Sequence, residues 1–454
     1  MGCEHSFSLK TLVAVRQQTD GRTPRFVVVS NYMFEFPWLL QACPALVTAP
    51  TVRPAHVEHA ARFFTCSLIR QVFMFTSANA AGGGDFARAN LRNFSVFHPV
   101  VPSFGTHHSK FLIVAYDKHV RVCIHTANYI SVDWGDKTEG VWMQDFPLKV
   151  AGAQPGSNSF EDDLVDYVTK TGWPGGLLAD GTRCGPDALR RYDFSAAHVA
   201  LVASVPGSHD GVRYGTRRMR ALLQRERFDP RGVGAPMVWQ FTSNGTVRED
   251  LLAEFGNAFC AGRTSDGPPL GKGHVRLVWP TVEEVRRSYE GWAGGGAIPG
   301  KRENIRRPEI RALHHRWAAD PSRGGRDTCP EGRARAQPHI KIFMRHQGPL
   351  ILWLLLGSHN LSGPAWGTET KKRQLRINSF ELGVMFLPSL LPQGATEMAC
   401  TAVTPAGVAG GKLGLRVPFS LPPAPYGPAD EPWDVETPRM QPDSRGCIVP
   451  RDGL

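Results

Sequence analysis

The chain has 454 residues, a formal net charge of +11, and 42% hydrophobic and 20% charged residues. This length allows about two or three domains with sizeable cores, and the composition excludes a disordered or fibrous protein. The positive charge favours an anionic partner, while apolar runs such as residues 350–356 are too short to span a membrane, so we expect no stable membrane association.

Several short patterns near the N-terminus and at the cysteines carry little functional information. Residues 1–6, MGCEHS, fit the pattern for N-myristoylation, which recurs by chance in short sequences, and we interpret it as chance. His56 and His59 lie one helical turn apart without a third ligand, which favours a solvated helix over a metal site. The nine cysteines are scattered and form no CxxC pair, so we expect neither zinc nor disulfides, and a reducing compartment.

Residues 108–128 predict a β-hairpin with three polar side chains at its open end. His108 and Lys110 precede the apolar strand FLIVAY, DKH forms a turn, and VRVCIH returns the chain towards Asn128. Side chains at i and i+2 share one face of a strand, so His108 and Lys110 point the same way. Folding the hairpin about residue 118 places His108 opposite Asn128.

Residues 339–367 repeat this pattern. His339 and Lys341 open a strand, HQGP turns the chain, and LILWLLL returns it to Asn360. The interval from His to Asn is 20 residues in the first copy and 21 in the second, and each Asn is followed by Trp at +6 and Gly at +7. These matched offsets indicate an internal duplication.

Two His-Lys-Asn sets brought together suit phosphodiester transfer without a metal or another cofactor. A neutral imidazole attacks phosphorus, and a protonated one donates to the leaving oxygen. Lysines neutralise the non-bridging oxygens, and asparagine amides add neutral donors. The alternative, two hairpins with surface histidines, leaves the paired Lys and Asn unexplained.

These motifs resemble the phospholipase D superfamily and, within it, the tyrosyl-DNA phosphodiesterases. Ala115 and His346 stand where the lipid hydrolases carry Asp, whereas the phrases FGTHHSK, PHIK and ELGV match the tyrosyl-DNA branch. The resemblance covers most of residues 26–450. It implies an α/β fold with two similar αβαβα-sandwich domains and the active site between them. We place the domains at residues 1–196 and 197–454, with a flexible insertion at residues 320–338.

The resemblance implies a DNA repair enzyme, acting as a monomer on single- or double-stranded DNA 3′ ends. It would hydrolyse the 3′-phosphotyrosyl bond to a stalled type I topoisomerase peptide through a phospho-histidine intermediate, and other 3′ blocks are further substrates. We expect the protein to be located in the nucleus, with the mitochondrion or the plastid as alternatives. Two other functions stay open: another nuclease or lipid phosphodiesterase of the superfamily, and a catalytically silent DNA-end-binding protein.

The same resemblance assigns roles to the motif residues. His108 would be the nucleophile and His339 the general acid and base. Lys110, Lys341, Asn128 and Asn360 would hold the phosphate oxygens. Glu381 matches a carboxylate that supports an active-site histidine. Glu139 stands where the family commonly has Gln, and its role stays open.

Further residues match positions around the centre. Those that match DNA contacts are Phe104, Ser243, Asn244, Gly245, Thr246 and Ser362. Tyr32 and Trp433 match positions on the peptide side, with core packing as the alternative. The basic stretch at residues 300–317 fits either a DNA track or an exposed charged surface.

Overall fold

The computed structural model describes residues 8–9, 12, 24–46, 71–77, 93–150, 159–318, 332–400 and 408–450. The MGCEHS pattern, His56 and His59, and residues 320–331 of the expected insertion lie outside these ranges. Within them, we find no helix that is both long and apolar enough to cross a membrane. Among the described residues, no two cysteines are joined in a disulfide.

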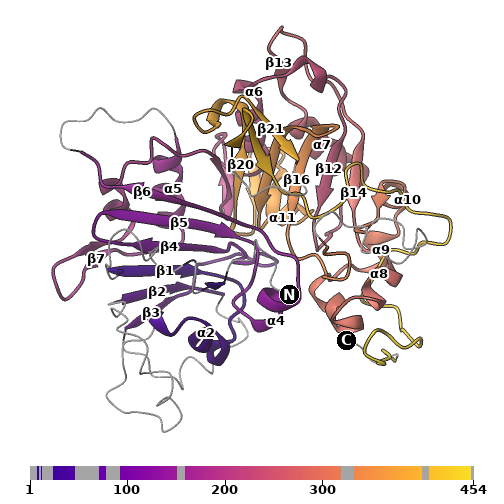
Figure 1. Cartoon of the computed structure of the whole chain (residues 1–454), viewed down its shortest axis with the longest axis horizontal. Coiled ribbons are helices and arrows are strands. Elements are labelled where there is room, and N and C mark those ends of the chain that lie inside the picture. The colour runs from indigo at the N-terminus through magenta and orange to yellow at the C-terminus, as the bar shows by residue number, and fades with distance from the viewer. Residues whose placement is uncertain are drawn as a thin grey trace.

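The first half of the chain forms a sheet of six described strands in the order β3-β2-β1-β4-β5-β6 (Figure 1). Their bounds are β1 Phe26–Ser30, β2 Gln71–Phe75, β3 Phe94–Phe97, β4 Phe111–Ala115, β5 His119–His125 and β6 Val141–Pro147. β1 pairs parallel with β2 and antiparallel with β4.

The second half forms a sheet of ten described strands, in which β12, β16 and β17 are neighbours and β20 joins β17 to β9. The bounds are β9 Ala200–Ser204, β12 Met237–Gln240, β14 Val275–Val278, β15 His314–His315, β16 Ile342–Gln347, β17 Leu350–Gly357, β20 Glu381–Phe386, β21 Glu397–Cys400, β22 Val408–Ala409 and β23 Lys412–Leu415. The division that we predict at residue 196 lies just before β9. The division of the chain into two domains at this point stays a prediction.

Short helices and small strands connect the two sheets and cover their faces. The helices are α2 Phe36–Ala42, α4 Ser131–Gly135, α5 Phe160–Lys170, α6 Gly215–Arg225, α7 Glu249–Phe259, α8 Val282–Arg286, α9 Arg302–Ile305, α10 Pro308–Arg311 and α11 Gly363–Trp366. The 3₁₀ turns are η1 Pro44–Leu46, η2 Pro186–Arg191, η3 Pro230–Gly232, η4 Gly291–Ala297 and η5 Pro388–Leu390. The small strands are β7 Gly176–Leu177, β8 Arg183–Cys184, β10 Gly207–His209, β11 Arg227–Phe228, β13 Arg263–Thr264, β18 Thr368–Glu369 and β19 Leu375–Ile377.

The apolar residues define five layers, because central strands of both sheets, such as β1, β4 and β17, bury side chains on both faces. The middle core contains Ile113 of the first sheet, Leu164 of α5 and Ile342 of the second sheet. The outer face of the first sheet packs on α2, and the outer face of the second packs on α6 and α7. The α/β class and the αβαβα sandwich are therefore confirmed, with one sheet from each half.

The duplication is visible in the strand pairing. β2-β1-β4-β5-β6 and β14-β12-β16-β17-β20 run in the same relative directions, so the two predicted hairpins take equivalent central positions. The first hairpin pairs Phe111 with Ile124, which centres it between residues 117 and 118 rather than on 118. The second shifts register between Arg345 and His346. This β-bulge absorbs the additional residue between His339 and Asn360.

Candidate active site

Backbone hydrogen bonds join the two halves directly beside each histidine. The amide of His108 donates to the carbonyl of Phe380 over 3.0 Å, and the amide of His339 donates to the carbonyl of Thr138 over 3.0 Å. Isolated bridges pair His107 with Phe380 and Thr138 with Pro338. Each His-x-Lys segment is therefore fixed against the opposite half of the chain.

Each histidine is hydrogen-bonded to a carboxyl group of the opposite half. Nδ1 of His108 lies 2.9 Å from Oε2 of Glu381, and Nδ1 of His339 lies 2.7 Å from Oε1 of Glu139. When the carboxylate accepts a hydrogen bond from Nδ1–H, Nε2 is the ring nitrogen that is left for attack or proton transfer. The structure thus brings together His108, His339, Glu381 and Glu139, as the sequence predicts.

A hydroxyl group holds each of these carboxyls, which the sequence interpretation missed. Thr126 donates to Glu139, and Ser358 donates to Glu381. Each hydroxyl also accepts a backbone N–H, from Gly140 over 2.9 Å and from Leu382 over 3.0 Å, so its own proton is directed to the carboxyl. Both hydroxyls lie two residues before the motif Asn, a repeat that the sequence does contain.

The two lysines lie beneath the histidines and are almost fully buried. Nζ of Lys110 donates to the carbonyl of His108 over 2.9 Å, and Nζ of Lys341 donates to the carbonyl of His339. Burial lowers the pKa of Lys110 to about 8 and that of Lys341 to about 7. An incoming phosphodiester anion opposes this effect of burial because it stabilises the charged ammonium form.

The two asparagines are held in different ways. The Oδ1 of Asn360 accepts from the amides of Thr242 (3.1 Å) and Ser243 (3.0 Å), which leaves its Nδ2 as a donor. Asn128 instead uses its Nδ2 and its backbone amide on Oδ2 of Asp133, at 2.9 and 2.7 Å. The predicted donor role therefore fits Asn360 directly, whereas one N–H of Asn128 is already committed to Asp133.

Asp133 and Lys137 complete the surroundings of His339, and the sequence did not single them out. Oδ2 of Asp133 lies 3.4 Å from Nδ1 of His339, and Nζ of Lys137 joins Asp133 (3.3 Å) to Glu290 (3.0 Å). Asp133, Glu139 and His339 have the donor types of a divalent metal site. Both carboxyls already accept hydrogen bonds from Asn128 and Thr126, so we interpret the group as support for the imidazole.

The two histidines and the two carboxyl groups have different protonation behaviour. Burial lowers the pKa of His108, and burial together with the Lys341 charge lowers that of His339 well below its usual range. Burial raises the pKa of Glu139 to about 7. Burial also acts to raise the pKa of Glu381, but the adjacent His108 outweighs it and the net shift is downward. Glu381 is therefore anionic at neutral pH, whereas Glu139 titrates there.

The residues that match DNA contacts differ in their accessibility. Phe104 is 93% exposed and has a backbone φ of 62°. The Asn378 side chain donates over 3.1 Å to the carbonyl of Ser103, the residue before Phe104. Thr246 is exposed, Ser243 is partly exposed, and both are open to a ligand. Asn244 is only 4% exposed, which favours a structural role in its loop.

Two of the remaining DNA-side residues pack against each other. A Cβ on Gly245 would lie 2.9 Å from Cβ of Ser362, so the close approach of the two loops requires glycine here. The Ser362 hydroxyl accepts from the amide of Ala365 over 3.3 Å and caps α11. Ser362 therefore positions α11, and it is partly exposed as well.

Tyr32 and Trp433 have different surroundings. The Tyr32 ring lies 5.7 Å from the His108 ring, and Nζ of Lys110 is 6.0 Å from its centroid, so Tyr32 borders the centre. Trp433 has no exposed surface, stacks on Trp292 at 5.8 Å and donates to the carbonyl of Gly295 over 3.1 Å. For Trp433 the structure favours the core-packing alternative over direct contact with a substrate.

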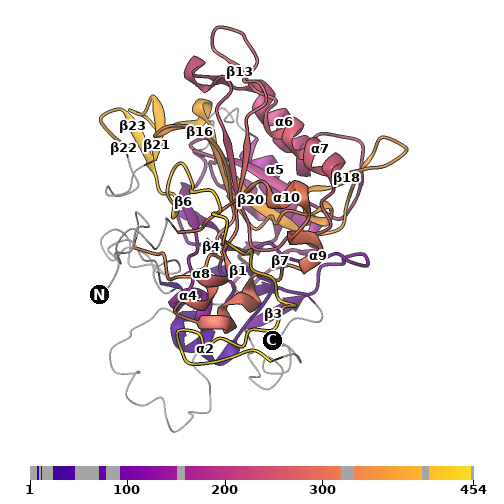
Figure 2. The same ribbon diagram turned by 90° about the vertical axis from the view of Figure 1, so that its right-hand side faces the viewer.

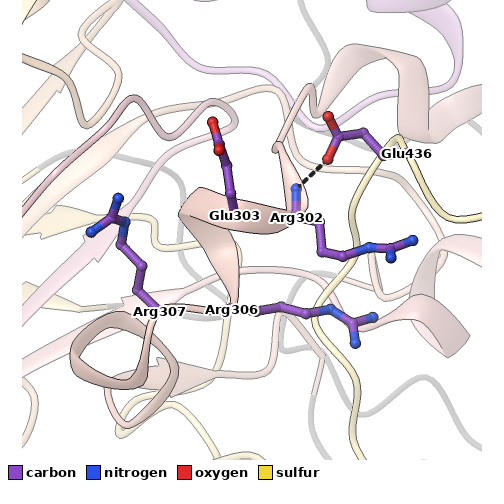
Figure 3. Close-up of a pocket in the computed structure, with 5 residues that line it drawn as sticks. All are labelled: Arg302, Glu303, Arg306, Arg307 and Glu436. Carbon is purple, nitrogen blue, oxygen red and sulfur yellow. Dashed lines mark hydrogen bonds between the residues drawn. The ribbon is translucent and has the colours of Figure 1, made fainter.

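The basic stretch at residues 300–317 lines a separate cavity of about 620 Å³ (Figure 3). Its lining residues are Arg302, Glu303, Arg306, Arg307 and Glu436. Arg306 lies 3.3 Å from Asp434 and 3.5 Å from Glu431, and the amide of Arg302 donates to Glu436 over 2.8 Å. Because carboxylates neutralise much of this positive charge, the structure favours the charged-surface alternative over a DNA track.

Comparison with known proteins agrees with this geometry. The family model for tyrosyl-DNA phosphodiesterase matches residues 11–427. Tyrosyl-DNA phosphodiesterase 1 of Arabidopsis thaliana is 37% identical over 460 residues, which cover 93% of this chain and 71% of the relative. Its counterpart in Drosophila melanogaster is 29% identical, covering 73% of this chain and 57% of the relative.

The fold is also similar to a solved structure. The crystal structure of the yeast tyrosyl-DNA phosphodiesterase matches with a TM-score of 0.66 and 16% identity, over 94% of this chain and 95% of that one. At this identity the likeness concerns the fold alone, and the family model and the Arabidopsis relative carry the assignment. The chain therefore belongs to the tyrosyl-DNA phosphodiesterase family, a family of phosphodiesterase enzymes.

Proposed function

We propose that this protein hydrolyses the 3′-phosphotyrosyl bond between DNA and a peptide left by a stalled type I topoisomerase. The observation that carries the proposal is the reciprocal pairing of His108 with Glu381 and of His339 with Glu139 around two buried lysines. Family membership supplies the substrate class, since the relatives are named for the tyrosyl-DNA bond.

In the first step, Nε2 of His108 attacks phosphorus and the P–O bond to tyrosine breaks. Glu381 accepts a hydrogen bond from the Nδ1–H of His108 and stabilises the positive charge that develops on the ring. His339 enters this step as the imidazolium, which Glu139, Asp133 and the bound phosphodiester anion stabilise, and it gives its Nε2 proton to the tyrosine oxygen. Lys110, Lys341 and Nδ2 of Asn360 stabilise the non-bridging oxygens, where negative charge accumulates.

In the second step, His339 removes a proton from water, the water oxygen attacks phosphorus, and the bond from phosphorus to Nε2 of His108 breaks. The products are a DNA 3′-phosphate and free His108. Glu139 holds the His339 ring in orientation through both steps, and Thr126 in turn holds Glu139. No step in this scheme requires a metal ion.

The proposal extends to other 3′ blocking groups, because the phosphate-binding groups do not depend on the identity of the leaving oxygen. We also propose that the protein acts as a monomer on single- or double-stranded DNA ends, and that its cellular location is the nucleus. The net charge of +11 supports binding to DNA.

A gel assay with two substrates tests the proposal. A 3′-phosphotyrosyl oligonucleotide should be converted to the 3′-phosphate product, and phosphatidylcholine should stay intact. The His108→Ala/His339→Ala double variant is the control for contaminating enzymes. Release of choline or phosphatidic acid, or degradation of the unmodified oligonucleotide, would favour another activity of the superfamily instead.

A further inference from the structure

A basic surface with an aromatic centre is connected through buried residues to His339 and has no role in the steps above. We call it the Tyr289 patch; it comprises Arg287, Tyr289, Arg335 and Arg445, which are all exposed. The guanidinium of Arg335 stands 4.9 Å from the centroid of the Tyr289 ring. Nε of Arg445 donates to the carbonyl of Tyr289 over 2.8 Å, and Nε of Arg335 donates to the carbonyl of Arg287 over 3.1 Å.

The positive charge of the Tyr289 patch is only partly neutralised. Arg287 pairs with Glu283, which also binds Arg286 at 2.6 Å. Among the residues that the structure describes, Arg335 and Arg445 form no ion pair with a carboxylate within 4.0 Å. The side chain of nearby Asp443 accepts instead from backbone amides, including that of Trp292 over 2.7 Å. Within the described part of the chain, two guanidinium groups therefore remain available to an anion, with the charge of Asp443 acting on that of Arg445 without a direct ion pair.

A short chain of contacts connects the Tyr289 patch to His339. Tyr289 precedes Glu290, whose carboxylate lies 3.0 Å from Lys137, and Lys137 lies 3.3 Å from Asp133. Oδ2 of Asp133 is 3.4 Å from Nδ1 of His339. Arg335 stands four residues before His339 in the sequence. Figures 1 and 2 mark α4, which carries Asp133, and α8, which carries Arg286, and the ion pair of Lys137 with Glu290 joins the segments that follow these two helices.

The in-line geometry of the proposed phosphoryl transfer places the leaving peptide on the side of His339. In a phosphoryl transfer the attacking and leaving groups lie roughly in line on opposite sides of phosphorus. With His108 as the nucleophile, the tyrosine oxygen leaves beside His339. Phe104, in contrast, lies four residues before His108, and the Asn378 side chain donates to the carbonyl of its neighbour Ser103 over 3.1 Å. The contacts of the Tyr289 patch lead to His339, on the leaving-group side, and not to the loop of Phe104.

We propose that the Tyr289 patch binds the peptide part of the adduct and favours peptides with acidic residues next to the tyrosine. The proposal rests on the phosphotyrosyl hydrolase function given above. Guanidinium groups suit carboxylates because their fixed N–H donors match both oxygens. The face of the Tyr289 ring away from Arg335 offers apolar surface to the peptide, since Tyr289 is 47% exposed.

The aromatic residues packed beneath the Tyr289 patch hold it rigid, and Trp433 is one of them. Trp292 follows Tyr289 by three residues and stacks on Trp433, and the guanidinium of Arg439 lies 5.1 Å from the Trp433 ring. Gly291, which lies between Tyr289 and Trp292 in the sequence, has a backbone φ of 61°, and a Cβ on it would lie 2.0 Å from the carboxylate of Asp443. A rigid binding surface loses less conformational entropy when a peptide docks.

Steady-state kinetics on three matched adducts test the proposal. Each carries the same single-stranded oligonucleotide, and its 3′-phosphotyrosine is flanked by Asp and Glu, by Asn and Gln, or by Lys. A fourth substrate carries tyrosine alone and reports the hydrolase function by itself. The proteins are the wild type, Arg335→Glu/Arg445→Glu and the control Arg183→Glu/Arg220→Glu, which makes the same charge change at exposed positions outside the patch.

We expect the wild type to show a KM about threefold to tenfold lower for the acidic than for the neutral peptide, as two partly exposed ion pairs allow. The Arg335→Glu/Arg445→Glu variant should lose this preference and favour the Lys peptide, with kcat and the tyrosine-only substrate unchanged. Equal KM values across the peptides, or the same change in the control variant, would overturn the proposal. Failure of the wild type on the tyrosine-only substrate would instead contradict the hydrolase function.

A duplex version of each substrate distinguishes peptide from nucleic acid as the ligand. If the patch binds peptide, the ratio of KM values between peptides should be the same on single-stranded and duplex DNA. A loss of duplex processing in Arg335→Glu/Arg445→Glu, without any dependence on the peptide, would show that the patch binds a DNA strand and would refute the proposal.

Discussion

Nδ1 of His108 and Oε2 of Glu381 lie 2.9 Å apart although 273 residues separate them in the chain, and they belong to opposite halves. His339 and Glu139 repeat this relationship at 2.7 Å. Each half supplies the histidine for one pair and the carboxyl for the other, so neither half alone contains a complete pair. Under the proposed mechanism, the association of the halves is therefore a condition of activity.

The ion pair between Lys137 and Glu290 should contribute strongly to that association. Both side chains are less than 10% exposed, and they connect the first half to the second. Glu290→Ala leaves a buried ammonium with only Asp133 as a counter-ion, so the free energy of unfolding should fall by about 3 kcal/mol. Urea denaturation measures this effect. Glu436→Ala, at an exposed position, should change stability by less than about 0.5 kcal/mol, and an equal loss in both variants would contradict the assignment.

Phe104 should contribute to binding and not to stability, because 93% of its surface is exposed. Phe104→Ala should weaken the affinity for a single-stranded 3′-phosphotyrosyl oligonucleotide by about 1–3 kcal/mol, the range for one stacked base. Phe104→Tyr retains a ring and should restore binding. Fluorescence anisotropy measures the affinity and thermal denaturation the stability. A stable Phe104→Ala variant with unchanged affinity would exclude the stacking role.

Glu139 should make stability depend on pH in a defined direction. Its pKa rises from 4.5 to about 7 on folding, so the native state binds the additional proton between these values. The stability that this proton contributes is fully present below about pH 4.5 and is lost as pH rises through 7. Glu139→Gln does not titrate, so its stability relative to wild type should increase from pH 5 to pH 8.

Glu381→Gln provides the matched control for this experiment. The pKa of Glu381 is lowered by folding, so its contribution is present above the unfolded value and is lost only as pH falls below it. Between pH 5 and pH 8 the difference between Glu381→Gln and wild type should stay constant. Urea denaturation at the two pH values separates the contributions of the two carboxyls to the free energy of unfolding. If the difference between Glu139→Gln and wild type were constant as well, Glu139 would already be ionised at pH 5.

Chelation tests the assignment of the charged groups that meet the phosphate. Because the proposed mechanism places Lys110 and Lys341 at that position, hydrolysis should proceed at an unchanged rate in excess EDTA. Asp133, Glu139 and His339 have the donor types of a metal site, so this measurement also decides between two interpretations of that group. Loss of activity in EDTA and recovery with Mg²⁺, Mn²⁺ or Zn²⁺ would assign them as ligands.

The sequence predicted the parts of the site that depend on local order. The hairpins at 108–128 and 339–360 followed from strand alternation and turn residues, and the repeated interval identified the duplication. It could not place Thr126, Asp133 or Glu290 by itself, because their partners come from distant segments or from loop geometry. Thr126 and Ser358 recur two residues before each Asn, so comparison of the two copies would have found them.

Burial was the property that the sequence predicted least well. Trp433 and Phe104 are both aromatic and both matched substrate positions, yet Trp433 is fully buried and Phe104 is 93% exposed. The difference arises from tertiary packing: Trp433 packs on Trp292 and Gly295 of η4, whereas the Asn378 side chain bonds the backbone beside Phe104 and leaves the Phe104 ring exposed. Because these contacts connect residues more than a hundred positions apart, local sequence patterns do not predict them.

The central claim is that His108 attacks phosphorus and that His339 transfers protons. A tyrosine phenol has a pKa near 10 and leaves with modest assistance, so His339→Ala should complete part of the first step. The second step needs the missing base. The most direct measurement is to incubate His339→Ala and His108→Ala with a labelled 3′-phosphotyrosyl oligonucleotide, followed by denaturing electrophoresis and peptide mapping. We predict a covalent protein–DNA band in His339→Ala, mapped to His108, and none in His108→Ala. A band in His108→Ala mapped to His339 would reverse the two roles, and the absence of a band from both variants would contradict a covalent mechanism.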